Sequence, residues 1–167
     1  MDDLKRLIRD VPDFPRRGIL FRDISPLLRE HFEATVRALD GLLTEAEWGE
    51  IDAVAGIESR GFILGAALAA RRGKGFVLVR KQGKLPPPVV DVAYDLEYGS
   101  SVLEMQCGHG RLLLVDDVLA TGGTMTASAD LCVRAGYEIR AIAALIDLKI
   151  IADYRWRALS ARTAVQY

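Results

Sequence analysis

Short apolar runs alternate with longer stretches of mixed polarity along most of the chain. Four of these runs are almost entirely apolar and predict buried strands: residues 51–57, 75–81, 111–117 and 139–147. Residues 59–73 and 124–135 follow two of the strands and are predicted to be helices, closed by Gly73 and Gly136. Apolar strands that alternate with helices are typical of a mostly parallel sheet covered on both faces. The pattern therefore predicts an α/β fold.

Prolines divide the first forty residues into shorter parts. Residues 3–11 predict a short amphipathic helix that stops at the first proline, and residues 12–24 are expected to be irregular. Ser25 followed by Pro26 is a favourable helix start, with the serine as N-cap, so a second helix should run from there into the low forties. The C-terminal residues 154–167 carry no motif that predicts an element or a function.

Residues 82–106 separate the second and third predicted strands. The segment contains three consecutive prolines, Pro86 to Pro88, followed by a stretch with the character of two strands. We expect a proline-stiffened loop that leads into a hairpin turning near Gly99 and Ser100. The chain contains no internal repeat, linker or low-complexity tract, and residues 1–167 are predicted to form a single domain.

Composition and charge limit the kinds of partner. The chain is 50% hydrophobic and 27% charged, as is usual for a globular protein. Its net charge of −1 disfavours binding to nucleic acid through a broad basic face, although a local basic pocket remains compatible with it. The longest apolar run, FILGAALAA, is far shorter than the roughly 20 residues that cross a bilayer. The charged start MDDLKRLIRD lacks the apolar core of a signal peptide. We therefore expect a soluble cytoplasmic protein without a membrane or nucleic-acid partner.

The cysteines and histidines are isolated from one another in sequence. Cys107 and Cys132 form no CxxC pair, which indicates a reduced protein with incidental thiols. His31 and His109 have no neighbouring metal-ligating residues, so a dedicated zinc site is not expected.

The third predicted strand ends in two adjacent carboxylates, Asp116 and Asp117. The residues that separate them from the next helix include a glycine- and hydroxyl-rich turn: Ala120, Thr121, Gly122, Gly123 and Thr124. Ligands of an open parallel sheet bind beyond the carboxyl ends of its strands, and a helix N-terminus favours an anion. Carboxylates accept hydrogen bonds from the hydroxyl groups of a ribose, and the glycine-rich turn can bind a phosphate. Residues 116–124 therefore predict a binding site for a sugar phosphate. The alternative is an N-cap and a tight connection with no ligand. The motifs GxGxxG and GxxxxGK[ST] are absent.

Four stretches together resemble the type I phosphoribosyltransferases. VDDVLATGGT is similar to their motif for phosphoribosyl diphosphate (PRPP), and its ending looks like that of the branch that acts on adenine. DFPRRGILFRDISPLL is similar to the N-terminal signature of that branch, GIESRGF to its diphosphate loop and VRKQGKLP…YDLEYG to its flexible catalytic loop. The match spans roughly residues 12–147 in the order found in the family. The resemblance implies a Rossmann-like core, a base-binding N-terminal hood within residues 1–25, and a flexible catalytic loop and hairpin at residues 82–106.

The resemblance also implies individual roles. Ala120, Thr121, Gly122, Gly123 and Thr124 would hold the 5′-phosphate of PRPP, and Asp116 and Asp117 its ribose hydroxyls. The diphosphate would be held by Ser59, Arg60, Arg80, Lys81 and Lys84. Adenine would be read by Leu20, Phe21 and Arg22, partly through the backbone, and Glu97 would be the catalytic carboxylate facing the N9 proton. Each group has a simpler alternative: a helix cap and surface arginine for Ser59 and Arg60, solvated cations for the lysines, core packing for Leu20 and Phe21, and an exposed hairpin carboxylate for Glu97.

The implied reaction transfers the phosphoribosyl group of PRPP to N9 of adenine, giving AMP and diphosphate in purine salvage. Mg²⁺ would be held mainly by the substrate, with no dedicated protein ligands, and the resemblance implies a homodimer. Relatives that act on 6-oxopurines typically have an aspartate where this chain has Ala120, which favours adenine. A 6-oxopurine or xanthine phosphoribosyltransferase, a PRPP-sensing regulator of transcription and a plain α/β binding module remain as alternatives.

The chain departs from the family pattern at two places. Arg17 precedes Gly18 where the family usually has proline before the glycine. The loop reads KLPPP where Lys-Leu-Pro-Gly is common. Loss of that glycine should stiffen the loop.

Overall fold

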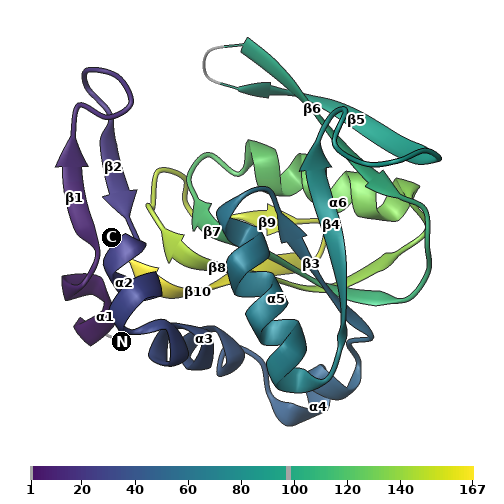
Figure 1. Ribbon diagram of the computed structural model, residues 1–167, viewed down its shortest axis with the longest axis horizontal. Coiled ribbons are helices and arrows are strands. Elements are labelled where there is room, and N and C mark those ends of the chain that lie inside the picture. The colour runs from purple at the N-terminus through teal and green to yellow at the C-terminus, as the bar shows by residue number, and fades with distance from the viewer. Residues whose placement is uncertain (1, 97–98) are drawn as a thin grey trace.

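The computed structural model describes residues 2–96 and 99–167. An eight-stranded sheet with the order β5-β6-β4-β3-β7-β8-β10-β9 forms its centre (Figure 1). The strands are β3 (Ala53–Ile57), β4 (Gly75–Lys81), β5 (Val89–Leu96), β6 (Gly99–Gln106), β7 (Arg111–Leu119), β8 (Glu138–Asp147), β9 (Arg155–Trp156) and β10 (Leu159–Gln166). The neighbours from β4 through β3, β7 and β8 to β10 are parallel, and the pairs at both edges are antiparallel. The predicted α/β fold with a mostly parallel sheet is confirmed.

Helices cover both faces of the sheet. Helix α5 (Arg60–Arg72) packs on one face, together with α3 (Phe32–Asp40), and α6 (Gly123–Arg134) packs on the other (Figure 1). Leu113 and Val115 of β7 belong to the core under α5, whereas Leu112 and Leu114 belong to the core under α6. Successive side chains of a strand point to opposite faces, so a strand covered on both sides must be apolar throughout. This explains why β7 could be predicted from an apolar run in the sequence.

The N-terminal segment forms a two-stranded hairpin, which we call the hood, from β1 (Arg9–Pro12) and β2 (Leu20–Asp23). Helix α1 (Asp2–Arg6) is therefore shorter than predicted, and the expectation that residues 12–24 are irregular is wrong for β2. Arg9 forms an ion pair with Asp23, its cross-strand neighbour. A second cross-strand pair joins Arg22 to Asp10. The backbone pairing of β1 with β2 forms the hood, and these two partly exposed ion pairs add modestly to it.

The long helix predicted from Ser25 is divided into two. Helix α2 (Ser25–Glu30) ends at His31, whose φ of −133° leaves the helical region, and α3 then begins at Phe32. The start is correctly predicted, but the cap is not Ser25. Asp23 accepts hydrogen bonds from the N–H and the hydroxyl of Ser25, at 2.9 and 2.6 Å.

Three further boundaries differ from the prediction. Strand β7 continues to Leu119, so the two aspartates lie inside the strand rather than at its end. Helix α4 (Glu45–Gly49), with a Thr44–Glu47 capping box, was not predicted. The C-terminal residues form β9 and β10, and β10 extends the parallel sheet next to β8.

The predicted hairpin of β5 and β6 is confirmed. Leu96 pairs with Gly99, so the connection lies at residues 97–98, just before the predicted position. The hairpin and the hood stand at opposite sides of the molecule and extend beyond the same end of the sheet (Figure 1). In the described part of the chain, no helix is long and apolar enough to cross a membrane.

Candidate functional site

Three loops meet at the carboxyl end of the sheet. They follow β3, β4 and β7, which are neighbours in the order β4-β3-β7. Because these strands are parallel, the chain leaves all of them at the same edge. The three stretches that the sequence analysis connected with PRPP are thereby brought side by side.

The loop after β7 forms a small cradle. A cavity of about 70 Å³ is lined by Asp116, by Val118 and by residues 119–125, which include all five residues predicted to hold a phosphate. Gly122 is the N-cap of α6, has a φ of +82° and leaves the start of the helix without a side-chain cap. Free N–H groups and the positive end of the helix dipole therefore face the cradle, as an anion requires.

The C-terminal segment supports this cradle from outside. A Cβ atom on Gly122 would lie 2.5 Å from Cδ2 of Tyr154. The Tyr154 hydroxyl is 3.0 Å from Oγ1 of Thr126, and Trp156 donates to Asp130 at 2.9 Å. The sequence analysis did not identify Tyr154, because no local pattern places residue 154 against residue 122.

Two buried carboxylates lie beside the cradle. Asp116 and Asp117 are 9% and 7% exposed, and the Asp117 N–H donates to Oδ1 of Asp116 at 2.9 Å. Burial raises the pKa of Asp116 well above its usual value, and the charge of Asp117 raises it further. Burial also raises the pKa of Asp117, against the opposing charge of Arg60. Such carboxylates are poised to accept hydrogen bonds from hydroxyl groups of a ligand.

Arg60 connects the aspartates to the hood. One of its terminal nitrogens lies 2.6 Å from Oδ2 of Asp117, and the other donates to the backbone carbonyl of Arg22 at 3.5 Å. Its guanidinium also lies 4.9 Å from the ring centre of Phe21. The neighbouring Ser59 is exposed and follows a cis peptide bond to Glu58. Arg60 is therefore no ordinary surface arginine, because it joins three segments of the chain.

The hood presents its predicted base-reading residues in different ways. The Phe21 ring meets Phe14 edge to face, with ring centres 5.1 Å apart. Leu20 is 46% exposed, so core packing does not explain it. The Arg22 side chain turns away and stacks 3.6 Å from the ring centre of Tyr167, which leaves only its carbonyl near Arg60. Backbone groups and Phe21 are therefore the parts of this strand that are closest to the site.

The predicted basic residues gather next to the loop after β3. Arg80 donates to Glu58 at 3.2 Å, and the Lys81 N–H donates to the same carboxylate oxygen at 2.9 Å. Partial burial by itself raises the pKa of Glu58, but the Lys81 N–H and Arg80 more than offset this, and the pKa lies below its usual value. Lys81 and Lys84 are exposed. The Arg80 side chain and the Lys81 backbone thus bond to the carboxylate that precedes Ser59, and Lys84 is linked to it only through its carbonyl, which accepts from Arg80 at 3.3 Å.

Glu97, the predicted catalytic carboxylate, lies outside the described residues. A cavity of about 340 Å³ separates the hairpin from the cradle, between Ala93 and Tyr94 of β5 and the loop at Thr121 and Gly122. Among the described residues, no group of three or more His, Cys, Asp or Glu side chains could hold a metal ion.

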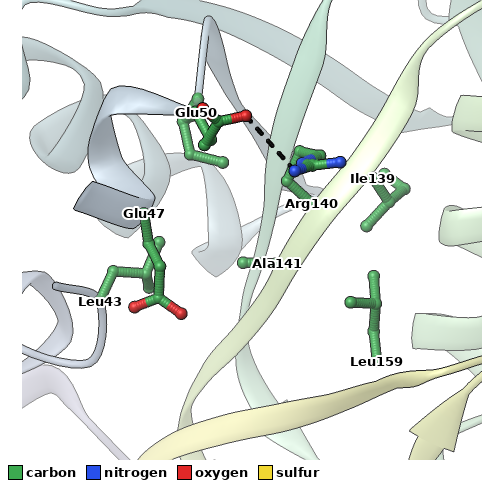
Figure 2. Close-up of a pocket in the computed structure, with 8 residues that line it drawn as sticks. Leu43, Glu47, Glu50, Ile139, Arg140, Ala141 and Leu159 are labelled. Carbon is green, nitrogen blue, oxygen red and sulfur yellow. Dashed lines mark hydrogen bonds and ion pairs between the residues drawn. The ribbon is translucent and has the colours of Figure 1, made fainter. Parts of the chain in front are cut away.

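A separate cavity of about 330 Å³ lies at the opposite end of the sheet, where β3, β8 and β10 begin (Figure 2). Its walls include Leu43, Ile139 and Leu159, and its rim carries Glu50 and Arg140, which are joined by an ion pair of 3.3 Å. None of the predicted site residues that the structure describes lines this cavity.

Comparison with known proteins agrees with this geometry. The phosphoribosyl transferase domain family matches residues 28–158. The chain is 48% identical over 165 residues to the adenine phosphoribosyltransferase of Hydrogenovibrio crunogenus, covering 98% of this chain and 96% of that protein. It is also similar to the crystal structure of the Thermoanaerobacter pseudethanolicus adenine phosphoribosyltransferase, with a TM-score of 0.88, 38% identity and 99% of each chain covered. The Saccharomyces cerevisiae adenine phosphoribosyltransferase, in complex with an imino-altritol bisphosphate and adenine, matches with a TM-score of 0.82, 37% identity and 88% of each chain covered.

Proposed function

Because the chain belongs to the adenine phosphoribosyltransferases of the phosphoribosyltransferase family, we propose that its three-loop site transfers the phosphoribosyl group of PRPP to N9 of adenine. The products are AMP and diphosphate, and the reaction is one of purine salvage. The observation that carries the proposal is the cradle of about 70 Å³ directly beside two buried carboxylates. An anion site and a pair of hydroxyl acceptors at this spacing suit the 5′-phosphate and ribose of one ligand.

The binding roles follow from this arrangement. Residues 120–124 hold the 5′-phosphate through the N-terminus of α6, and Asp116 and Asp117 accept hydrogen bonds from the ribose hydroxyls. Ser59 and Arg60 bind the diphosphate together with Arg80, Lys81 and Lys84. Two features support this assignment: Arg80 and the Lys81 backbone bond to Glu58 in the loop after β3, and Arg60 reaches Asp117 at 2.6 Å.

Catalysis is mainly a matter of charge placement. As the bond between C1 and the diphosphate breaks, positive charge develops on the ribose and negative charge on the leaving group. Asp116 and Asp117 face the cationic sugar, and Arg60 and the loop cations face the diphosphate. Closure of the loop excludes water that would otherwise hydrolyse the activated sugar. Glu97 accepts the N9 proton of adenine, and no protein nucleophile is needed.

Mg²⁺ enters the site with PRPP in this proposal. The ion would be held mainly by the diphosphate and ribose oxygens of PRPP, with no dedicated protein ligands. The ion would supply charge neutralisation for the diphosphate.

Base selection falls to the hood and to Ala120. Phe21 packs at the site through Arg60, and the backbone of β2 reaches the site, where the Arg22 carbonyl accepts a hydrogen bond from Arg60. A backbone N–H facing N1 of the base and a carbonyl facing its 6-amino group select adenine over hypoxanthine, which has the reverse pattern. A 6-oxopurine or xanthine enzyme is less well supported, because Ala120 cannot handle a ring proton.

We further propose that the protein works in the cytoplasm as a homodimer whose partners are adenine and PRPP. The small hood of β1 and β2 lacks the size of a DNA-binding element, which disfavours the PRPP-sensing regulator.

The test is a single assay in which PRPP and Mg²⁺ are mixed with adenine, hypoxanthine, guanine, xanthine or uracil and nucleotide formation is measured. We expect kcat/KM for adenine to exceed that for every other base by at least about 100-fold. Each buried polar group left mismatched by a wrong base costs about 1–3 kcal/mol. Comparable turnover of hypoxanthine would show that the base is wrongly assigned, and absence of PRPP consumption with any base would exclude the enzyme.

A further inference from the structure

A buried carboxylate lies beneath the start of the catalytic loop. Glu104 of β6 is only 3% exposed. Its two oxygens accept hydrogen bonds from three consecutive backbone N–H groups, those of Gly83 at 2.9 Å, Lys84 at 2.6 Å and Leu85 at 2.7 Å. A carboxylate bonded in this way forms charge-assisted hydrogen bonds, which are about twice as strong as neutral ones.

The backbone of this turn is shaped to meet the carboxylate. Gly83 has a φ of +80°, a backbone conformation that residues other than glycine rarely adopt. Just before it, the Gln82 N–H donates to the Val102 carbonyl at 3.0 Å and continues the pairing of β4 with β6. Residues 82–85 are therefore fixed to β6, although most of their surface is exposed.

The same turn is held from its other side by the diphosphate loop. Arg80 donates to the Lys84 carbonyl at 3.3 Å and to Glu58 at 3.2 Å. Glu58 in turn precedes Ser59 and Arg60. The backbone of Lys84 thus lies between two carboxylates, directly bonded to Glu104 and linked through Arg80 to Glu58.

We propose that Glu104 is a positioning residue for diphosphate binding: by fixing the backbone of residues 83–85 to β6, it sets the position from which the Lys84 side chain reaches the diphosphate. The inference rests on the proposed function, which assigns Lys84 to the diphosphate. A preorganised turn lowers the ordering cost when PRPP binds. Glu104 itself does not touch the substrate.

The main test is a double-mutant cycle with Glu104→Gln and Lys84→Met. Glutamine keeps the size of the side chain but turns an NH₂ group toward backbone N–H donors. We expect Glu104→Gln to lower kcat/KM for PRPP by about 10- to 100-fold, the loss typical of hydrogen bonds to a charged group. The KM for adenine should stay within about threefold of wild type. Because Glu104 acts through Lys84, the double variant should be within about threefold of Lys84→Met alone.

A second pair of variants tests the turn without altering the buried carboxylate. A Cβ atom on Gly83 meets no atom within 4 Å, so Gly83→Ala introduces only backbone strain at φ +80°. Gly73→Ala is the matched control, since Gly73 has a φ of +61°, is equally free of neighbours and ends α5 far from the site. Gly83→Ala should raise the KM for PRPP severalfold, and Gly73→Ala should lower the melting temperature without changing either KM.

The outcomes separate this inference from its premise. If Glu104→Gln lowers only the melting temperature, or if the losses in the double variant multiply, Glu104 merely supports the fold and the proposal is wrong. Normal PRPP kinetics in Lys84→Met would also overturn it. In each of these cases wild-type protein would still convert adenine and PRPP to AMP, so the proposed function would stand.

Discussion

At the scale of single residues, the phosphate cradle depends on a glycine at position 122. A Cβ atom there would lie 2.5 Å from the Tyr154 ring, and the φ of +82° would strain any side chain. We expect Gly122→Ala to weaken PRPP binding at least tenfold and to lower the free energy of unfolding by about 1–3 kcal/mol, as overpacking typically does. Calorimetry and urea unfolding measure the two effects.

Gly49 provides the control for this change. It lies in α4, where an added Cβ meets no atom within 4 Å. Gly49→Ala should bind PRPP normally and be as stable as wild type or slightly more so. Near-normal PRPP affinity in a folded Gly122→Ala protein would show that the phosphate is not bound in this loop.

Asp116 should reveal a conflict between stability and binding. Its folded pKa is raised, first by burial and then by Asp117. The stability that this carboxyl contributes is present below its unfolded pKa and is lost as the pH rises through the folded pKa. Each unit by which the pKa is raised corresponds to about 1.4 kcal/mol. Asp116→Asn does not titrate, so at pH 7 it should be more stable than wild type and yet bind PRPP at least tenfold more weakly.

Unfolding curves measured at several pH values check the sign of this effect. The stability advantage of Asp116→Asn should shrink as the pH falls toward 4, where the wild-type carboxyl becomes protonated in both states. A variant that is less stable than wild type at pH 7 would mean that Asp116 contributes a net favourable interaction to the free protein.

At the scale of elements, burial on both faces decided what could be predicted. Strands β3, β7 and β8 are largely buried on both sides and therefore appear in the sequence as apolar runs. Strand β4 is only partly buried, but its residues 76–79 are all apolar. The hood strands and β10 are half exposed, and their mixed composition gives no clear period. The hood is formed instead by backbone pairing between distant residues, such as Arg9 and Asp23, which are 14 residues apart. No local pattern contains that information.

The same distinction applies to the site. Residues 116–124 are contiguous and could be recognised together, and the structure brings them into one cradle. Tyr154, Glu58 and Glu104 act through partners 19 or more residues away. Glu104 alternates with apolar neighbours in β6 and so has the appearance of an ordinary strand carboxylate. Only the fold shows that its oxygens meet the backbone of the catalytic loop.

Glu97 lies between β5 and β6 in the sequence. Adenine must lose its N9 proton as the glycosidic bond forms, and a positioned base typically contributes about 10²- to 10⁴-fold to such a step. We expect Glu97→Gln to lower kcat by that factor while PRPP affinity changes little, because the phosphate and ribose contacts come from other loops. Steady-state kinetics and calorimetry measure the two quantities separately.

The control for Glu97→Gln must be an exposed carboxylate outside the site. Glu104 is unsuitable, because it is buried and bonded to three backbone N–H groups. Glu138 at the start of β8 lies at the opposite end of the sheet and is exposed. Glu138→Gln should remain within threefold of wild type. A Glu97→Gln enzyme with similarly unchanged kcat would require another proton acceptor.

At the scale of the whole molecule, Arg60 joins parts of the chain that are far apart in sequence. It contacts Asp117 of β7 and the backbone of Arg22 in the hood. The hood is also held from behind, where Tyr167 stacks against both Arg22 and Lys5. Arg60 thus links the parts of the site that we propose to bind the base and the ribose, and Tyr167 at the C-terminus packs against the hood.

The proposed homodimer is the prediction that concerns the whole molecule. Ile63, in the second turn of α5, is 43% exposed and lies just beyond the diphosphate loop. Single exposed apolar residues are common on protein surfaces, so Ile63 alone does not demonstrate an interface. We expect light scattering at micromolar concentration to give twice the mass of one chain. If the dimer interface covers the face of α5 that carries Ile63, Ile63→Glu should shift the protein toward the monomer. An unpaired charge buried in an apolar contact is costly. Ile150→Glu is the comparison, since Ile150 is 58% exposed in the loop after β8. A wild-type monomer with full activity would contradict the prediction, whatever the two variants show.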